Sequence, residues 1–329
     1  MKPTEKVRVG RTDLSITRMG MGGAALGGLY HEVSDPAAER TVEAAWGHGI
    51  NFFDTAPLYG HGRSEERMGS VLRTHPRDTF VLSTKVGRIL VPTNSSKVKS
   101  VWFENPAPFE PLFDFSYDGV MRSFEESLRR LRLERVDILL IHDPDDHYKE
   151  ALLGAYPALH KLRSQGAVKA IGAGMNQAEM LASFAREGDF DCFLLAGRYT
   201  LIDHSGLREL LPLCQQKNVS IIIGGPYNSG ILAGGAVSGA KFNYQDAPPE
   251  IVDRVTRIDE VCRRHSIPLK AAALQFPLAH PAVASVIPGA RSAAEMEENF
   301  ALMTVSIPRD FWEDLREEGL LPNEAPVPE

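Results

Sequence analysis

Four residues with ionisable side chains occupy positions from which they could act together. Asp54, Lys85 and His142 each end a short apolar run, and Tyr59 follows Asp54 by five residues. A lysine at the end of a buried strand is costly unless it is paired, and Asp54, one strand away, is the obvious partner. Such a pair could be purely structural, because ion-pair networks also occur in proteins without a catalytic role.

With Tyr59 included, the group could transfer a proton. A neighbouring ammonium favours the phenolate and is expected to lower the pKa of the tyrosine from about 10. A phenol tuned in this way can exchange a proton with a carbinol oxygen near neutral pH, and His142 could orient or polarise that oxygen. The group has no redox centre of its own, so we expect a bound cofactor to carry the hydride.

The segments that hold these residues alternate between short apolar runs and amphipathic helical patterns. The apolar runs lack a two-residue alternation, which is typical of parallel strands buried on both faces. We expect strands over residues 18–22, 51–54, 80–85, 137–142, 167–172, 193–195, 219–223 and 284–287. We expect helices over residues 35–48, from Ser64, and over 117–131, 150–165, 177–186, 206–216, 251–265 and 293–302. The helix at 35–48 has Asp35 as its expected N-cap.

Eight strand–helix units predict an α/β fold, a (β/α)8 TIM barrel with long βα loops at its C-terminal face, formed by residues 1–329 as one domain. An open doubly wound sheet would need G-x-G-x-x-G after an early strand, and the glycines from Gly20 to Gly28 do not have that spacing. The two long loops, 87–116 and 224–249, leave the face where barrel enzymes place their sites.

The composition excludes several other classes. The chain has 329 residues, a net charge of −7 and no run rich in Lys and Arg, so nucleic acid is not an expected partner. The N-terminus lacks an apolar signal core, and the apolar runs are too short to cross a membrane. Three widely spaced cysteines form no metal motif and indicate reduced thiols. We therefore expect a cytoplasmic protein, while its oligomeric state stays open.

The run Asp-Thr-Ala-Pro-Leu-Tyr-Gly at 54–60, with Lys85 and His142 ending the next two strands, resembles the aldo-keto reductases. Segments at 170–176 and 286–299 extend the resemblance over residues 7–305. The resemblance implies that Tyr59 is the acid/base, that Lys85 and Asp54 tune it, and that His142 orients the substrate oxygen.

The resemblance also implies where a nicotinamide cofactor binds. Asn176 would hold the carboxamide, and residues 224–230 would wrap the pyrophosphate with backbone N–H groups. Two departures from the family pattern affect these contacts: the run Gly172–Asn176 is one residue longer than usual, and Ala196 replaces a common glutamine. The expected cofactor-binding residues are Gly22, Asn176, Gly224, Pro226, Asn228, Gly230, Pro288, Gly289, Arg291, Glu295, Glu298 and Asn299.

The residues near the adenine end favour NAD over NADP. NADP-preferring relatives carry Lys and Arg where this chain has Gly289 and Glu295. The loss of charge-assisted bonds to a 2′-phosphate forfeits roughly 1.5–3 kcal/mol each. A carboxylate would repel that phosphate but could accept a hydrogen bond from a free 2′-hydroxyl. Arg291 is close enough to keep NADP as an alternative.

Residues 113–119 and 141–145 resemble a branch of the family that contains L-fucose (D-threo-aldose) 1-dehydrogenases and pyridoxal 4-dehydrogenases. The resemblance implies a small-molecule substrate, a sugar or pyridoxal, whose cyclic hemiacetal is oxidised to a lactone. Trp102 and Phe113 are candidate aromatic walls, and Asp143 and Asn94 are candidate polar contacts. The aromatic side chains could equally well only pack the loop.

Three other functions stay open at this point. The chain could be a general aldehyde or ketone reductase of the same family, or a cofactor-binding regulatory protein with the same fold. The cluster His142–His147 could also suggest a metal-dependent hydrolase, although its spacing matches no particular metal site, and no metal is expected.

Overall fold

A computed structural model of the chain describes residues 1–93, 98 and 100–328, with a closed parallel barrel at its centre. The barrel strands are β3 (Met21–Gly22), β4 (Phe52–Asp54), β5 (Val81–Val86), β8 (Ile138–His142), β9 (Ala170–Met175), β10 (Cys192–Ala196), β11 (Ser220–Gly224) and β14 (Val283–Ile287). Each strand pairs in parallel with the next in this order. Parallel bridges Met19↔Val286 and Gly22↔Gly289 join the last strand to the first. The predicted TIM barrel is therefore confirmed, and the open sheet is excluded.

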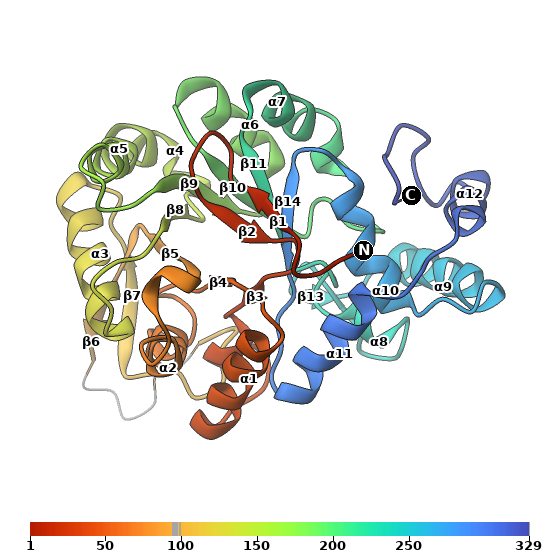
Figure 1. Cartoon of the computed structure of the whole chain (residues 1–329), viewed down its shortest axis with the longest axis horizontal. Coiled ribbons are helices and arrows are strands. Elements are labelled where there is room, and N and C mark those ends of the chain that lie inside the picture. The colour runs from red at the N-terminus through yellow and green to blue at the C-terminus, as the bar shows by residue number, and fades with distance from the viewer. Residues whose placement is uncertain (94–97, 99, 329) are drawn as a thin grey trace.

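Helices form a layer around the barrel (Figure 1). They are α1 (Asp35–Gly47), α2 (Arg63–Leu72), α3 (Tyr117–Leu131), α5 (Tyr156–Ser164), α6 (Ala178–Glu187), α7 (Leu210–Lys217), α10 (Leu269–Gln275) and α11 (Ala293–Met303). Helices α9 (Pro249–Arg264) and α12 (Arg309–Glu317) pack against each other outside this layer. No helix in the described part of the chain is long and apolar enough to span a membrane.

Short hairpins close one end of the barrel and extend the loops at the other. The N-terminal strands β1 (Lys6–Arg8) and β2 (Ser15–Thr17) pair antiparallel, and Ile16 of β2 packs into the barrel interior. The first long loop contains the antiparallel pair β6 (Arg88–Pro92) and β7 (Phe109–Phe113), and the second contains β12 (Lys241–Phe242) and β13 (Gln245–Asp246). Short helices α4 (Tyr148–Glu150) and α8 (Ile231–Gly234) follow β8 and β11.

Alternation along each strand determines which side chains enter the barrel. Phe52, Val81 and Leu140 belong to the interior cluster, whereas their neighbours Phe53 and Leu82 belong to the cluster under the helices. Because successive side chains point to opposite faces, the residues two positions after interior residues return to the interior. This parity brings Asp54, Lys85 and His142 to the interior side at the C-terminal ends of β4, β5 and β8.

The structure corrects three predicted boundaries. The strand expected over 167–172 starts at Ala170 and continues to Met175, because its glycines serve close packing: a Cβ on Gly172 would lie 1.9 Å from the Cys192 carbonyl oxygen. The N-cap of α1 is Ser34, whose side chain accepts from the Ala37 amide, so Asp35 lies in the first turn instead. The helix expected over 150–165 is interrupted by a π-helical turn, Ala151–Ala155, just before Pro157 enters α5.

Candidate active site

The Lys85–Asp54 pair predicted from the sequence is present inside the barrel. Lys85 Nζ donates to Asp54 Oδ2 at 2.7 Å and to the Thr55 carbonyl at 2.9 Å, and Ser83 Oγ donates to Asp54 Oδ1 at 2.6 Å. The Lys85 and Asp54 side chains are only 1% and 2% exposed.

Tyr59 lies above this pair, on a turn that two glycines permit. Its ring centroid is 4.7 Å from Lys85 Nζ, and its ring meets the His142 ring edge to face at 5.7 Å. Gly60 has φ +63°, and a Cβ there would come within 2.4 Å of the Gly27 carbonyl oxygen. The close approach of these two glycine backbones holds the Tyr59 turn against the loop that follows β3.

The predicted direction of the Tyr59 pKa shift is wrong. Burial, then Asp54 and Asp143, raise the pKa of Tyr59 well above its usual value, and only Arg88 opposes them. The prediction rested on the Lys85 ammonium beside the phenol. That ammonium is paired with Asp54 and lies over the face of the phenol ring, and burial has the largest effect on the pKa of Tyr59. Without a further positive charge, Tyr59 therefore stays a phenol and can act as an acid.

His142 is held in its neutral form. Burial, followed by Arg88 and Lys85, lowers the pKa of His142 well below its usual value. Its Nε2 lies 3.4 Å from Asp143 Oδ2, and burial raises the pKa of Asp143 to about 6. A neutral imidazole has one N–H, so His142 can donate a hydrogen bond to an oxygen that reaches the Tyr59 hydroxyl.

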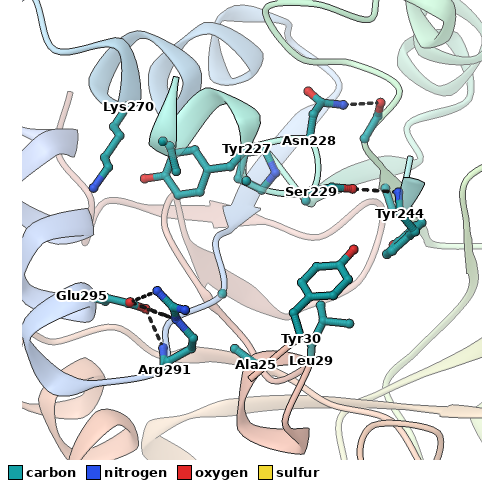
Figure 2. Close-up of a pocket in the computed structure, with 18 of the residues that line it drawn as sticks. Ala25, Leu29, Tyr30, Tyr227, Asn228, Ser229, Tyr244, Lys270, Arg291 and Glu295 are labelled. Carbon is teal, nitrogen blue, oxygen red and sulfur yellow. Dashed lines mark hydrogen bonds and ion pairs between the residues drawn. The ribbon is translucent and has the colours of Figure 1, made fainter. Parts of the chain in front are cut away.

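A cavity of about 550 Å³ opens between the loop after β3 and the segments that follow β10, β11 and β14 (Figure 2). None of the four side chains above lines it, but Asn176 does, two residues after Gly174, which pairs with His142. Nine of the twelve residues expected to bind a cofactor line the cavity. They are Asn176, Pro226, Asn228, Gly230, Gly289, Arg291, Glu295, Glu298 and Asn299. Gly22, Gly224 and Pro288 do not line the cavity; the Gly22 amide donates to the Pro288 carbonyl where the barrel closes.

The end of the cavity near Asn176 matches the expected carboxamide site. Asn176 Nδ2 donates to the Ala196 carbonyl at 2.9 Å, and both residues line the cavity. The longer run before Asn176 therefore does not displace it from the site. Ala196, where relatives often have glutamine, offers a backbone carbonyl that is already engaged by Asn176.

Residues 224–230 bend sharply around the middle of the cavity. Gly225, Asn228, Ser229 and Gly230 all have positive φ, from 45° to 98°. Asn228 Nδ2 donates to the Gly197 carbonyl at 3.0 Å, which fixes the segment to the end of β10. The amides of Asn228 and Gly230 donate within the segment, to Gly225 and Tyr227, so fewer amides are free for a phosphate than expected.

The far end of the cavity contains two cation–carboxylate pairs, of which Figure 2 shows Arg291 with Glu295. Arg291 binds Glu295 through its side chain at 2.6 Å and through its backbone amide at 2.8 Å. Lys270 Nζ donates to both oxygens of Glu298, at 2.8 and 2.9 Å. Both cations that face this end are therefore already matched by carboxylates.

Comparison with known proteins agrees with this geometry. The model of the Aldo/keto reductase family matches residues 18–318. The chain belongs to the aldo/keto reductase family. It is accordingly an oxidoreductase that uses a nicotinamide cofactor.

This aldo/keto reductase is 42% identical to a pyridoxal 4-dehydrogenase from Microbacterium luteolum, over 98% of the chain and 99% of that protein. It is 40% identical to a D-threo-aldose 1-dehydrogenase from a Pseudomonas species, over 94% of the chain and 96% of that protein. Among solved structures, it shares its fold with a glycerol dehydrogenase from Gluconobacter oxydans, with a TM-score of 0.78 at 23% identity over 99% of the chain and 98% of that chain.

The predicted substrate residues of this aldo/keto reductase lie around the mouth of the barrel, the opening at the C-terminal ends of its strands. They do not line the large cavity. Trp102 and Phe113 are 41% and 50% exposed, and Asp143 contacts His142. Asn94 lies outside the described residues. Within the described part of the chain, no three His, Cys, Asp or Glu side chains are grouped as a metal ion would require.

Three residues at the mouth were not predicted from the sequence. Phe103, rather than Trp102, lies next to the Tyr59 ring, at 6.1 Å between centroids. Tyr244 lines the cavity, and its ring lies 6.4 Å from that of Trp102. Arg88 pairs with Asp143 at 3.3 Å. A sequence signal existed only for Arg88, as a charged residue three positions after Lys85.

Proposed function

We propose that this aldo/keto reductase oxidises a cyclic hemiacetal to its lactone and transfers the hydride to NAD. The observation that carries the proposal is the buried group of Asp54, Lys85, Tyr59 and His142 beside a cavity large enough for most of a dinucleotide. The names of the two relatives at 42% and 40% identity support the substrate class, because pyridoxal and aldoses both form cyclic hemiacetals with a ring C–OH.

In the proposed reaction, Tyr59 is the acid/base. The hemiacetal O–H gives its proton to the Tyr59 oxygen while the C–H hydrogen leaves as hydride, and the remaining C–O bond becomes the lactone carbonyl. When bound, an oxidised nicotinamide would supply the hydride acceptor, and its positive charge would favour the phenolate that this direction requires. In the reverse direction, Tyr59 donates its proton to a carbonyl oxygen.

The other three side chains support that proton transfer. Lys85, held by Asp54, keeps a positive charge under the Tyr59 ring. His142 donates its single N–H to the substrate oxygen, and its lowered pKa keeps it neutral through the physiological range. Exposed phenol and imidazole groups would be solvated by water, so burial is what leaves both free to bind the reacting oxygen.

For the cofactor, the residues present fit a dinucleotide. Asn176 would bind the carboxamide, residues 225–230 would enclose the pyrophosphate, and Tyr227, which donates to Asn299 Oδ1 at 2.6 Å, would lie with Asn299 at the adenine end. Gly22, Gly224 and Pro288 shape the barrel end next to the nicotinamide rather than contacting the cofactor.

The preference for NAD rests on the two matched cations. A 2′-phosphate brings about 1.5 to 2 negative charges near neutral pH, and it would have to compete with Glu295 for Arg291 and with Glu298 for Lys270. The 2′-hydroxyl of NAD needs only an acceptor, which either carboxylate supplies. The engaged Arg291 therefore does not rescue NADP binding.

Around the substrate, Asp143 supplies a polar contact and Trp102, Phe103 and Phe113 supply aromatic surface at the mouth. We further propose that residues 1–329 act as one domain and that the protein works in the cytoplasm on a small molecule. Two functions compete with this one. The chain could be a general reductase of aldehydes and ketones, or it could keep the fold and the cofactor but act as a regulatory protein.

The proposed function is tested by incubating the protein with NAD and, separately, pyridoxal, L-fucose and D-glucose, and by identifying the product. We expect NADH and a lactone in equal amounts with pyridoxal or L-fucose. NADH-dependent reduction of simple aldehydes with no hemiacetal oxidation would favour the general reductase instead. Cofactor binding without turnover in either direction would favour the regulatory protein.

A further inference from the structure

Two side chains that take no direct part in the reaction, Phe113 and Asp143, hold Arg88 at the mouth of the barrel. Its guanidinium lies 4.4 Å over the ring of Phe113, which faces it across the β6–β7 hairpin. Its Nη2 donates to Asp143 Oδ2 at 3.3 Å, and the same oxygen lies 3.4 Å from His142 Nε2. Arg88 is therefore linked to His142 through one shared carboxylate oxygen.

The guanidinium of Arg88 has hydrogen-bonding capacity to spare. Its Nε is buried and has no acceptor among the residues that the structure describes, and the side chain is only 12% exposed. A buried donor without a partner costs about 1–3 kcal/mol. The contact with Asp143 is also longer than the 2.7–2.9 Å or so of a strong charge-assisted bond. These features suit a group that binds an oxygen arriving with the substrate.

Arg88 is also the cation that acts on both reacting side chains. Burial, Asp54 and Asp143 raise the pKa of Tyr59, and Arg88 lowers it. After burial, Arg88 contributes most to the lowered pKa of His142. Lys85 also lowers the pKa of His142, but less than Arg88 does, and two of its three N–H groups already donate to Asp54 and to the Thr55 carbonyl.

We propose that Arg88 is a substrate-binding residue whose guanidinium binds an oxygen carried by the substrate beside its reacting C–OH. The inference rests on the proposed function and adds a specificity determinant to it. In an aldose this oxygen is the 2-hydroxyl, and in pyridoxal it is the ionised 3-oxygen of the ring. Both accept hydrogen bonds, and both lie close to the carbon that loses the hydride. Asp143 and Phe113 position the guanidinium.

The test compares substrates with and without that oxygen. The wild type and Arg88→Met are assayed with NAD on L-fucose against its 2-deoxy analogue, and on pyridoxal against its 3-deoxy analogue. Both members of a pair share any loss that arises through Tyr59 and His142, so the readout is the ratio of kcat/KM between the substrate that carries the oxygen and its deoxy analogue. We expect Arg88→Met to lower that ratio about ten- to a hundredfold. The pair that shows this selective loss identifies which of the two oxygens Arg88 binds.

Arg77 provides a matched control. Its guanidinium lies 4.6 Å over the ring of Phe80 and binds Asp137 Oδ2 at 2.6 Å, which reproduces the Arg88 arrangement near the N-terminal ends of β5 and β8. Arg77→Met removes a similar set of contacts far from the mouth. We expect it to lower stability while leaving the ratio of kcat/KM between each substrate and its deoxy analogue unchanged.

The inference is overturned if Arg88→Met loses kcat/KM equally on both members of each pair, so that it still prefers the substrate with the oxygen as strongly as the wild type does. That result leaves the proposed function standing. If the wild type oxidises no hemiacetal, the proposed function fails. Arg88 is then judged by NADH-driven reduction of lactaldehyde against propanal: loss of the preference for lactaldehyde in Arg88→Met supports its role, and a retained or absent preference contradicts it.

Discussion

Lys85 and Asp54 form a direct ion pair at 2.7 Å, and almost none of either side chain is exposed to solvent. The pair accounts for two properties of the site. It retains a charge inside the barrel at a tolerable cost, because each ion has further hydrogen-bond partners. After burial, which has the largest effect, its Asp54 carboxylate also raises the pKa of Tyr59.

Breaking the pair on one side should destabilise the fold more than removing both charges. Lys85→Met leaves the Asp54 carboxylate buried without its cation, and we expect the free energy of unfolding to fall by about 3–5 kcal/mol. The double variant Lys85→Met/Asp54→Asn should recover part of that loss. Urea unfolding of both variants measures this, and a double variant that is no more stable than the single one contradicts the account.

Freeing Arg291 should admit NADP. Glu295→Gln removes the carboxylate that binds Arg291 through both its side chain and its amide, and a charge-assisted bond to phosphate is worth about 1.5–3 kcal/mol. We therefore expect the ratio of NAD to NADP affinity, measured by titration, to fall at least tenfold. Glu313→Gln, which removes a comparable i,i+4 pair with Arg309 on α12, is the control and should leave the ratio unchanged.

Asp143 should set the position of the pH profile for oxidation. Its carboxyl has a pKa of about 6, raised by burial, and its ionised form raises the pKa of Tyr59. Oxidation requires deprotonated Tyr59, so kcat/KM should rise with pH. In Asp143→Asn the Tyr59 pKa falls, and the rising limb should move toward lower pH by about 1 unit. A limb that stays in place, or moves upward, would show that Asp143 does not act on Tyr59.

Two other buried histidines should make the fold sensitive to acid. Burial lowers the pKa of His204 and of His280 to about 4 each, whereas an unfolded histidine titrates near 6.5 or so. Between these values the unfolded chain binds protons that the folded chain does not. Stability is therefore lost as pH falls from about 6.5 toward 4, by at most about 1.4 kcal/mol per pH unit for each histidine.

The variants His204→Gln and His280→Gln check this dependence. Each should flatten the plot of unfolding free energy against pH in that window, as measured by urea unfolding at a series of pH values. His160→Gln, at an exposed position, is the control and should leave the slope as it is. Equal slopes in all three variants would mean that His204 and His280 do not drive the acid loss.

The barrel, the three polar residues at its strand ends and Tyr59 after β4 could be predicted from the sequence because they depend on local patterns. An apolar run of four or five residues that ends in Lys85 or His142 marks a strand and the face at its end. The boundary of β9 was misplaced because glycine usually weakens a strand, whereas Gly172 lies where the Cys192 backbone leaves no room for a side chain.

The residues of the mouth depend on contacts between distant segments. Phe103 lies beside Tyr59 in a loop that is held by distant segments: the Ala107 amide donates to the Gly60 carbonyl, and the Glu104 amide donates to the Gly28 carbonyl. Tyr244 reaches the cavity from a hairpin turn with positive φ at Asn243 and Tyr244, a conformation that the sequence alone does not suggest for a tyrosine. The direction of the Tyr59 pKa shift likewise depends on burial and on how far Lys85 is neutralised.

The most direct test of the account is the NAD-dependent oxidation of pyridoxal and L-fucose by Tyr59→Phe beside the wild type. If Tyr59 carries the proton, kcat should fall by about 10²–10⁴-fold, while NAD binds with unchanged affinity. A Tyr59→Phe variant that turns over either substrate at close to the wild-type rate would contradict the central claim.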